Sequence, residues 1–208
     1  LDLLADAVQR PALAPADFER EKALLAARVD ARPSEPREVA PVVMSAALFG
    51  TGDPRGRPAE GYAATVAGLT LADVKAAAPT LLHPKGAVLV VAGDFDPAAL
   101  RAALTRRLGG WRSAAAPPPP APAPFATNPA GLQLLLVDRP GAPQTLVVGA
   151  RPLPATDGAA RAARRLADVA LGGSFTSRLM QNLREKHGYT YGARSRIAER
   201  ERQPILTV

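Results

Sequence analysis

The segment Leu171–Gly192, LGGSFTSRLMQNLREKHGYTYG, is the most specific stretch of this chain. Two adjacent glycines end the Ala/Arg-rich pattern before it, and Ser174 is placed to cap a helix that runs through apolar residues to Lys186. Gly188 supplies the left-handed conformation in which helices commonly end, and the aromatic residues beyond it favour a strand. The stretch therefore predicts a glycine turn, a helix with an arginine in its last turn, and a strand.

Helical and strand patterns alternate on both sides of this segment. We expect helices at 1–10, 15–33, 35–49, 71–78, 97–108 and 158–171. The apolar runs that we expect to form strands are 86–93, 132–137, 145–150, 190–197 and 204–208. The Pro/Ala-rich residues 114–130 predict a semi-rigid linker. The pattern indicates an α+β fold made of parts of two related domains, 1–113 and 131–208.

Composition limits the chemistry that the chain can perform. It has 208 residues, a net charge of +7, no cysteine, and two histidines, His83 and His187. These counts exclude disulfides, thiol catalysis and Cys-based zinc sites, and they disfavour a His-rich metal centre. The positive charge suggests nucleic acid, but Arg178–Arg202 mixes acids with bases and holds no RNA-binding aromatic motif, so we expect no nucleic-acid partner. No apolar run reaches the roughly 18 residues of a membrane span.

Four segments together resemble the insulinase/pitrilysin (inverzincin) zinc metallopeptidases, a family that includes the mitochondrial processing peptidases and their inactive partner subunits. In chain order the segments are Ala5–Leu25, Ala87–Leu100, Pro117–Pro124 and Leu171–Gly192. The resemblance implies that 1–113 is the C-terminal part of a first peptidase-like domain, and that 131–208 begins a second, inactive-type domain. It also implies an antiparallel-rich sheet packed on helices in each domain, and a fragment of a bacterial zinc protease.

The resemblance also indicates where zinc ligands would lie. Active members bind zinc through an H-x-x-E-H motif and a distant glutamate. No H-x-x-E-H occurs here, and in the family that motif lies upstream of the part that this chain resembles. The distant glutamate follows, by seven residues, the position that Glu21 matches, and this chain has Arg28 there. Because a guanidinium has no lone pair for a metal, the resemblance implies no bound zinc and no activity of this chain on its own.

Inactive members of the family contribute an arginine and a tyrosine that face the zinc of a separate catalytic subunit. The resemblance places this pair at Arg184 and Tyr189, whose side chains can donate hydrogen bonds to a peptide carbonyl. A structural alternative is that Arg184 complements the helix dipole. Gly172 and Gly173 are further candidates for binding peptide backbone through free N–H groups, with an ordinary interhelix turn as the alternative.

Three functions are compatible with these residues. The leading hypothesis is a non-catalytic chain that pairs with an H-x-x-E-H-bearing subunit or domain, which holds the zinc, and encloses an extended peptide at a sheet edge. The second is a fragment of a single-chain active zinc metallopeptidase whose motif lies upstream. The third is a structural subunit that serves assembly only. Two-subunit bacterial relatives are often exported, so the resemblance implies the periplasm, with the cytoplasm as the alternative.

Overall fold

The computed structural model describes residues 1–112, 131–198 and 204–208, which separate into two compact units. One unit takes in the described residues of Leu1–Arg32 and Pro58–Ala123. The other takes in those of Pro33–Arg57 and Pro124–Val208. The predicted linker, 114–130, lies outside the described residues, so its conformation stays a prediction.

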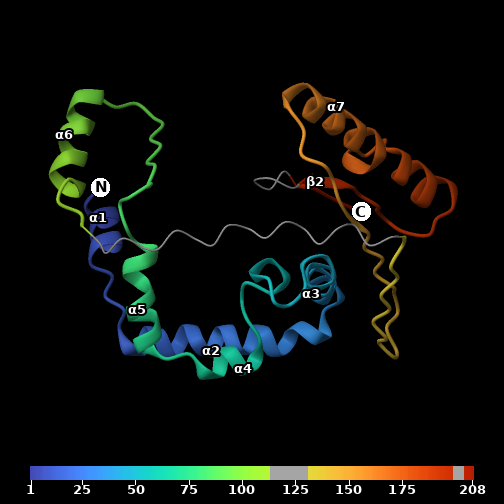
Figure 1. Ribbon diagram of the computed structural model, residues 1–208, viewed down its shortest axis with the longest axis horizontal. Coiled ribbons are helices and arrows are strands. Elements are labelled where there is room, and N and C mark those ends of the chain that lie inside the picture. Colours follow the sequence, from blue (N-terminus) through green and yellow to red (C-terminus); the bar gives the residue numbers. More distant parts are fainter. Residues whose placement is uncertain (113–130, 199–203) are drawn as a thin grey trace. The chain divides into compact units, whose positions relative to one another are not determined.

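The described part of the first unit is helical (Figure 1). Its helices are α1 (Asp2–Gln9), α2 (Pro15–Ala31), α4 (Ala63–Gly68), α5 (Leu71–Leu81) and α6 (Pro97–Leu108). Local start signals explain the last two, as predicted. The Thr70 hydroxyl accepts a hydrogen bond from the Asp73 N–H at 3.2 Å, and the Asp96 carboxylate accepts one from the Ala98 N–H at 2.8 Å.

Helix α4 lies beside α2 (Figure 1). Val29 of α2 and Val66 of α4 are both buried. Lys22 of α2 donates from Nζ to the carbonyl oxygens of Ala67 and Leu69, at 2.9 and 2.8 Å. A cation at the C-terminal carbonyls of a helix stabilises it, so Lys22 fastens the end of α4 to α2.

Helix α1 lies against α6 through polar contacts. Arg107 forms an ion pair with Asp2, with 2.6 Å between Nε and Oδ1. Gln9 donates from Nε2 to the Arg107 carbonyl oxygen at 2.9 Å. These bonds connect two helices that are about a hundred residues apart in the sequence.

The predicted strands 86–93 and 132–137 are wrong in this structure, and 145–150, 190–197 and 204–208 are shorter than predicted, since the strands are Ala150–Pro152, Arg196–Ala198 and Ile205–Thr207. The run 86–93 is not a strand, and instead of being buried its Val88 is 86% exposed. The run 132–137 is likewise exposed and unpaired, and of 145–150 only Ala150 enters a strand. None of the three strands in the described sheet pairs with 86–93 or 132–137. A strand depends on a partner's ladder of hydrogen bonds, and apolar sequence alone does not supply one.

The described part of the second unit combines helices with a small sheet. Its elements are α3 (Pro36–Phe49), η2 (Pro54–Gly56), β1 (Ala150–Pro152), α7 (Gly158–Asp168), η3 (Val169–Gly173), η4 (Met180–Lys186), β2 (Arg196–Ala198) and β3 (Ile205–Thr207), and the short turn η1 (Arg32–Ser34) precedes α3. The strand order is β1-β3-β2 with antiparallel pairing, so that Thr207 lies opposite both Ala150 and Arg196. This mixture confirms the predicted α+β class.

Helix α7 continues into η3, which is π-helical, and η4 is π-helical as well (Figure 1). The helical run ends at Gly173 and not at Leu171 as predicted, because Gly172 and Gly173 belong to η3 and the backbone becomes extended at Ser174. Ser174 does not cap the next helix as predicted; its carbonyl oxygen accepts a turn hydrogen bond from the Ser177 N–H at 3.2 Å. Gly188 is left-handed as predicted, with φ +65°.

Candidate functional site

Arg28, where the resemblance predicts that a zinc ligand is missing, is engaged in an ion pair. Its guanidinium donates to Glu60 Oε1 at 3.0 Å, while Arg32 donates to the other carboxylate oxygen at 2.9 Å. Arg32 also donates to the Gly61 carbonyl at 3.0 Å. The side chain of Arg28 is 73% exposed and that of Arg32 only 11%. Two arginines thus hold one carboxylate between the end of α2 and the segment before α4.

The residues around Arg28 do not fit a zinc ion. The hydrogen bonds from Arg28, and then from Arg32, hold the pKa of Glu60 below its ordinary value. Glu21 is engaged as well, since its Oε1 accepts from Arg20 at 3.1 Å. Across the described ranges, no group of three or more His, Asp or Glu side chains is arranged to hold a metal. With carboxylates committed to guanidinium groups, this part of the fold lacks the donor set that zinc requires.

The guanidinium of Arg184, in the last turn of η4, contacts two aromatic rings. Its Cζ lies 4.9 Å from the ring centroid of Phe175 and 5.1 Å from that of Tyr191. Its Nε lies 3.5 Å from a carboxylate oxygen of Glu185, and the side chain is 27% exposed. Within the part of the chain that the structure describes, its two terminal nitrogens make no hydrogen bond. These nitrogens are therefore available to an oxygen ligand.

Tyr189, the predicted partner of Arg184, contacts a different residue. Its ring stacks on that of His187, with centroids 5.1 Å apart and planes 12° apart. Its backbone N–H donates to the Leu183 carbonyl at 2.9 Å, which fixes the chain just beyond η4. The structure thus places Tyr189 next to the end of η4, with its phenol exposed, while Tyr191 is the tyrosine in contact with the Arg184 guanidinium.

Gly172 has a packing role at the junction of η3 with the segment that leads to β2. A Cβ added there would lie 2.7 Å from Ser195 Oγ and 2.8 Å from Leu179 Cδ1. Both distances are too short for a real side chain. At Gly173 the nearest atom to an added Cβ is the Asp168 carbonyl oxygen, at 3.2 Å. The two glycines are therefore explained by close backbone approach, and their predicted role in binding peptide stays a prediction.

Asp168 fastens the end of α7 to β2. Its carboxylate accepts a hydrogen bond from the Ser195 hydroxyl at 2.6 Å and one from the Ile197 N–H at 3.3 Å. Ser195 is buried. This contact joins the end of α7 to the segment that enters β2.

The sequence did not identify Phe175, Tyr191 or Asp168. The sequence shows that residues 175 and 191 are aromatic. The residues after Gly188 form no regular strand until Arg196, so their spacing does not show which side chain faces Arg184. The Asp168–Ser195 bond joins residues 27 apart in the sequence and had no local signal.

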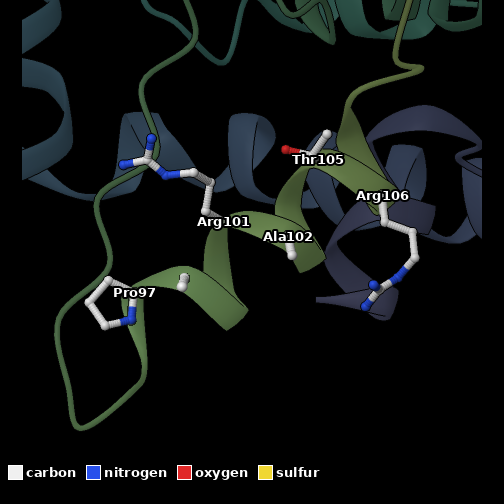
Figure 2. Close-up of a pocket in the computed structure, with 6 residues that line it drawn as sticks. Pro97, Arg101, Ala102, Thr105 and Arg106 are labelled. Atoms are coloured by element: carbon white, nitrogen blue, oxygen red, sulfur yellow. The ribbon is translucent and has the colours of Figure 1, made fainter.

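A hollow of about 770 Å³ lies along one face of α6 (Figure 2). Its lining residues are Pro97, Ala98, Arg101, Ala102, Thr105 and Arg106. Arg101 and Arg106 extend away from each other and do not converge on one point (Figure 2). Predicted site residues do not line it, and we assign it no role.

Residues 68–208 match the protein family described as the peptidase M16 inactive domain. An uncharacterized zinc protease of Mycobacterium tuberculosis is 31% identical over 198 residues, and one of Mycobacterium leprae is 30% identical over 202 residues. Each alignment covers 95% of this chain but 44% of the relative, so the chain spans less than half the length of these proteins.

Two solved structures share the fold. A peptidase M16 inactive domain from Pseudomonas fluorescens superposes with a TM-score of 0.74 at 22% identity, covering 99% of this chain and 48% of that one. A protease from Helicobacter pylori superposes with a TM-score of 0.79 at 18% identity, covering 99% of this chain and 50% of that one. In the described residues, no helix is both long and apolar enough to cross a membrane.

Proposed function

The chain belongs to the peptidase M16 inactive-domain family, and on that premise we propose that it binds an extended peptide through Arg184 and a neighbouring phenol. In this proposal the chain does not cleave the peptide. It presents the peptide to zinc held by an H-x-x-E-H-bearing subunit or domain. The relatives named as zinc proteases support this setting, because each is more than twice as long as the aligned segment.

The observation that carries the proposal is the state of Arg184. Its guanidinium is held against two rings, while its terminal N–H groups have no partner in the described part of the chain. A planar fork of N–H donors matches peptide carbonyl and carboxylate oxygens. Aimed at a peptide carbonyl, such donors stabilise the negative charge that develops on its oxygen during hydrolysis. Arg184 would therefore bind substrate and assist a zinc centre that it does not itself contain.

Two tyrosines are candidates for the phenol that assists Arg184. Tyr189 is the residue that the family resemblance indicates, and its exposed ring is fixed by the stack on His187. Tyr191 has direct contact with Arg184 in its favour, since its ring lies 5.1 Å from the guanidinium carbon. A hydroxyl has to reach the same peptide carbonyl as Arg184 to assist it, so substituting each tyrosine separately distinguishes them.

The ion pair of Arg28 supports the assignment of substrate binding to this chain and of zinc to another subunit or domain. In this proposal catalytic zinc lies elsewhere, because Arg28 and Arg32 already bind Glu60 and the donor set there does not fit the metal. No step of the chemistry is therefore assigned to this part of the chain. What the chain contributes is a substrate contact.

The exposed apolar runs favour a second function, assembly. Val88 and Leu132, which the sequence pattern predicts in strands, lie on the surface. Exposed apolar segments of this kind can pair with the edge of another sheet, or pack against its face, when one is present. A purely structural role would use these segments and would not need Arg184.

Peptide cleavage tests the proposal. The chain is combined with the H-x-x-E-H-bearing subunit or domain of the same source, and kcat/KM is measured on a quenched fluorescent peptide. We expect Arg184→Ala to lower kcat/KM by about 10²-fold, as for the loss of one oxyanion donor. Tyr189→Phe and Tyr191→Phe identify the phenol that assists.

Arg178→Ala is the matched control, since Arg178 is an exposed arginine one and a half turns earlier in the chain. Equal cleavage by all variants, with the chain still required, contradicts the proposal and favours assembly. Stoichiometric zinc on the purified chain would contradict the assignment of zinc to a partner.

A further inference from the structure

Phe175 lies in the turn between η3 and η4 and is not part of the core. Its side chain is 71% exposed, so burial in a core does not account for its place. Its ring contacts the guanidinium of Arg184, which lies 4.9 Å from the ring centroid. An arginine over an aromatic face within about 6 Å is attracted by the electrons of the ring.

The contact restricts Arg184 without using its hydrogen-bond donors. An arginine side chain has several rotatable bonds, and fixing them costs entropy when a ligand binds. Rings at 4.9 and 5.1 Å hold the guanidinium before the ligand arrives. The one carboxylate beside it, that of Glu185, lies 3.5 Å from Nε and leaves the terminal nitrogens open. Stacking therefore preorganises the side chain more than ion pairing does.

We propose that Phe175 is a positioning residue: its ring holds the Arg184 guanidinium so that the terminal nitrogens point to a peptide oxygen. This inference rests on the proposed function of Arg184, but it assigns a role to a residue that does not itself donate to the peptide. Gly172, three residues before Phe175, is buried against Ser195 and Leu179.

Two measurements on the whole chain test it. The first is the Nε–Hε signal of Arg184 in ¹H–¹⁵N spectra, which the ring currents of neighbouring aromatic side chains displace. The signal is assigned by its absence from the spectrum of Arg184→Lys. The second is the affinity for a fluorescein-labelled ten-residue peptide with blocked ends, by anisotropy. We expect Phe175→Leu to return the signal toward its ordinary position and to weaken binding about two- to fivefold, the equivalent of one exposed cation–π contact. Phe175→Trp restores both.

The outcomes separate this inference from the proposed function. If Arg184→Ala weakens binding but Phe175→Leu changes neither signal nor affinity, only the role of Phe175 is overturned. If Arg184→Ala binds the peptide as well as the wild type does, the proposed function fails, and the positioning role fails with it. Phe95→Leu, at an exposed phenylalanine of the first unit, controls for loss of a surface ring and is expected to change neither readout. Far-UV circular dichroism melting checks that each variant is folded.

Discussion

Arg28 and Glu60 form an ion pair at 3.0 Å, so the residue at which the family resemblance predicts a missing zinc ligand has an acidic partner of its own. Arg32 completes the arrangement from the next turn of the chain, at 2.9 Å. The two ion pairs fasten the end of α2 to the segment before α4.

The two arginines of this cluster should differ in their contribution to stability. Arg32 is the more buried and also donates to the Gly61 carbonyl, whereas Arg28 is largely solvated. Exposed ion pairs contribute little, while removing a buried partner leaves polar groups unsatisfied. We expect Arg32→Ala to lower the urea midpoint clearly and Arg28→Ala to lower it little. Equal losses, or a larger loss for Arg28→Ala, would contradict the assignment.

The same cluster predicts a dependence on pH. The pKa of Glu60 is held below its ordinary value of 4.5, chiefly by Arg28 and then by Arg32. A depressed carboxylate pKa contributes stability above the unfolded value, and that contribution is lost as pH falls through the folded value. Glu60→Gln should therefore be less stable than wild type at neutral pH, and the difference should shrink below pH 4.5. Denaturation curves at several pH values check this, and a difference that grows on acidification would contradict it.

Gly172 should tolerate no side chain. Its added Cβ would meet Ser195 Oγ at 2.7 Å and Leu179 Cδ1 at 2.8 Å, so Gly172→Ala forces η3 away from the segment before β2. We expect a loss of about 1–3 kcal/mol in the free energy of unfolding, the usual cost of overpacking. Gly158→Ala is the control, because nothing lies within 4 Å of a Cβ there. Unchanged stability of Gly172→Ala would show that this approach is not close in solution.

The Asp168–Ser195 contact should stabilise the second unit. Ser195→Ala removes a buried hydroxyl that donates at 2.6 Å and leaves Asp168 with a weaker set of donors. A loss of about 1.5–3 kcal/mol is expected for a hydrogen bond to a charged group. Hydrogen exchange should show the Ile197 amide exchanging faster in this variant. If both stability and exchange match the wild type, Asp168 does not anchor β2.

Helices were predictable from this sequence because their signals are local. Asp96 followed by Pro97 marks the start of α6, and Thr70 marks the start of α5. Strands were less predictable, because pairing joins distant segments. The run 86–93 has strand composition and no described partner, whereas Ile205–Thr207 pairs on both sides.

The candidate site was partly predictable for a related reason. Arg28 and Arg184 could be chosen from a family pattern, which depends on order and spacing along the chain. Their contacts could not, because Glu60 lies 32 residues from Arg28, and Phe175 approaches Arg184 only through the turn between η3 and η4. Which tyrosine contacts Arg184 depends on the path of the backbone beyond Gly188, and the chain forms no helix or strand there from which that path could be predicted.

Whether Arg184 binds peptide is decided by the peptide affinity of the arginine variants. Arg184→Ala and Arg178→Ala remove the same charge from neighbouring turns, but only Arg184 lies against Phe175 and Tyr191. With the labelled ten-residue peptide, we expect Arg184→Ala to raise the dissociation constant by about tenfold or more, as for a lost charged hydrogen bond, and Arg178→Ala to leave it near the wild-type value. Equal affinities of the two variants would contradict peptide binding by Arg184.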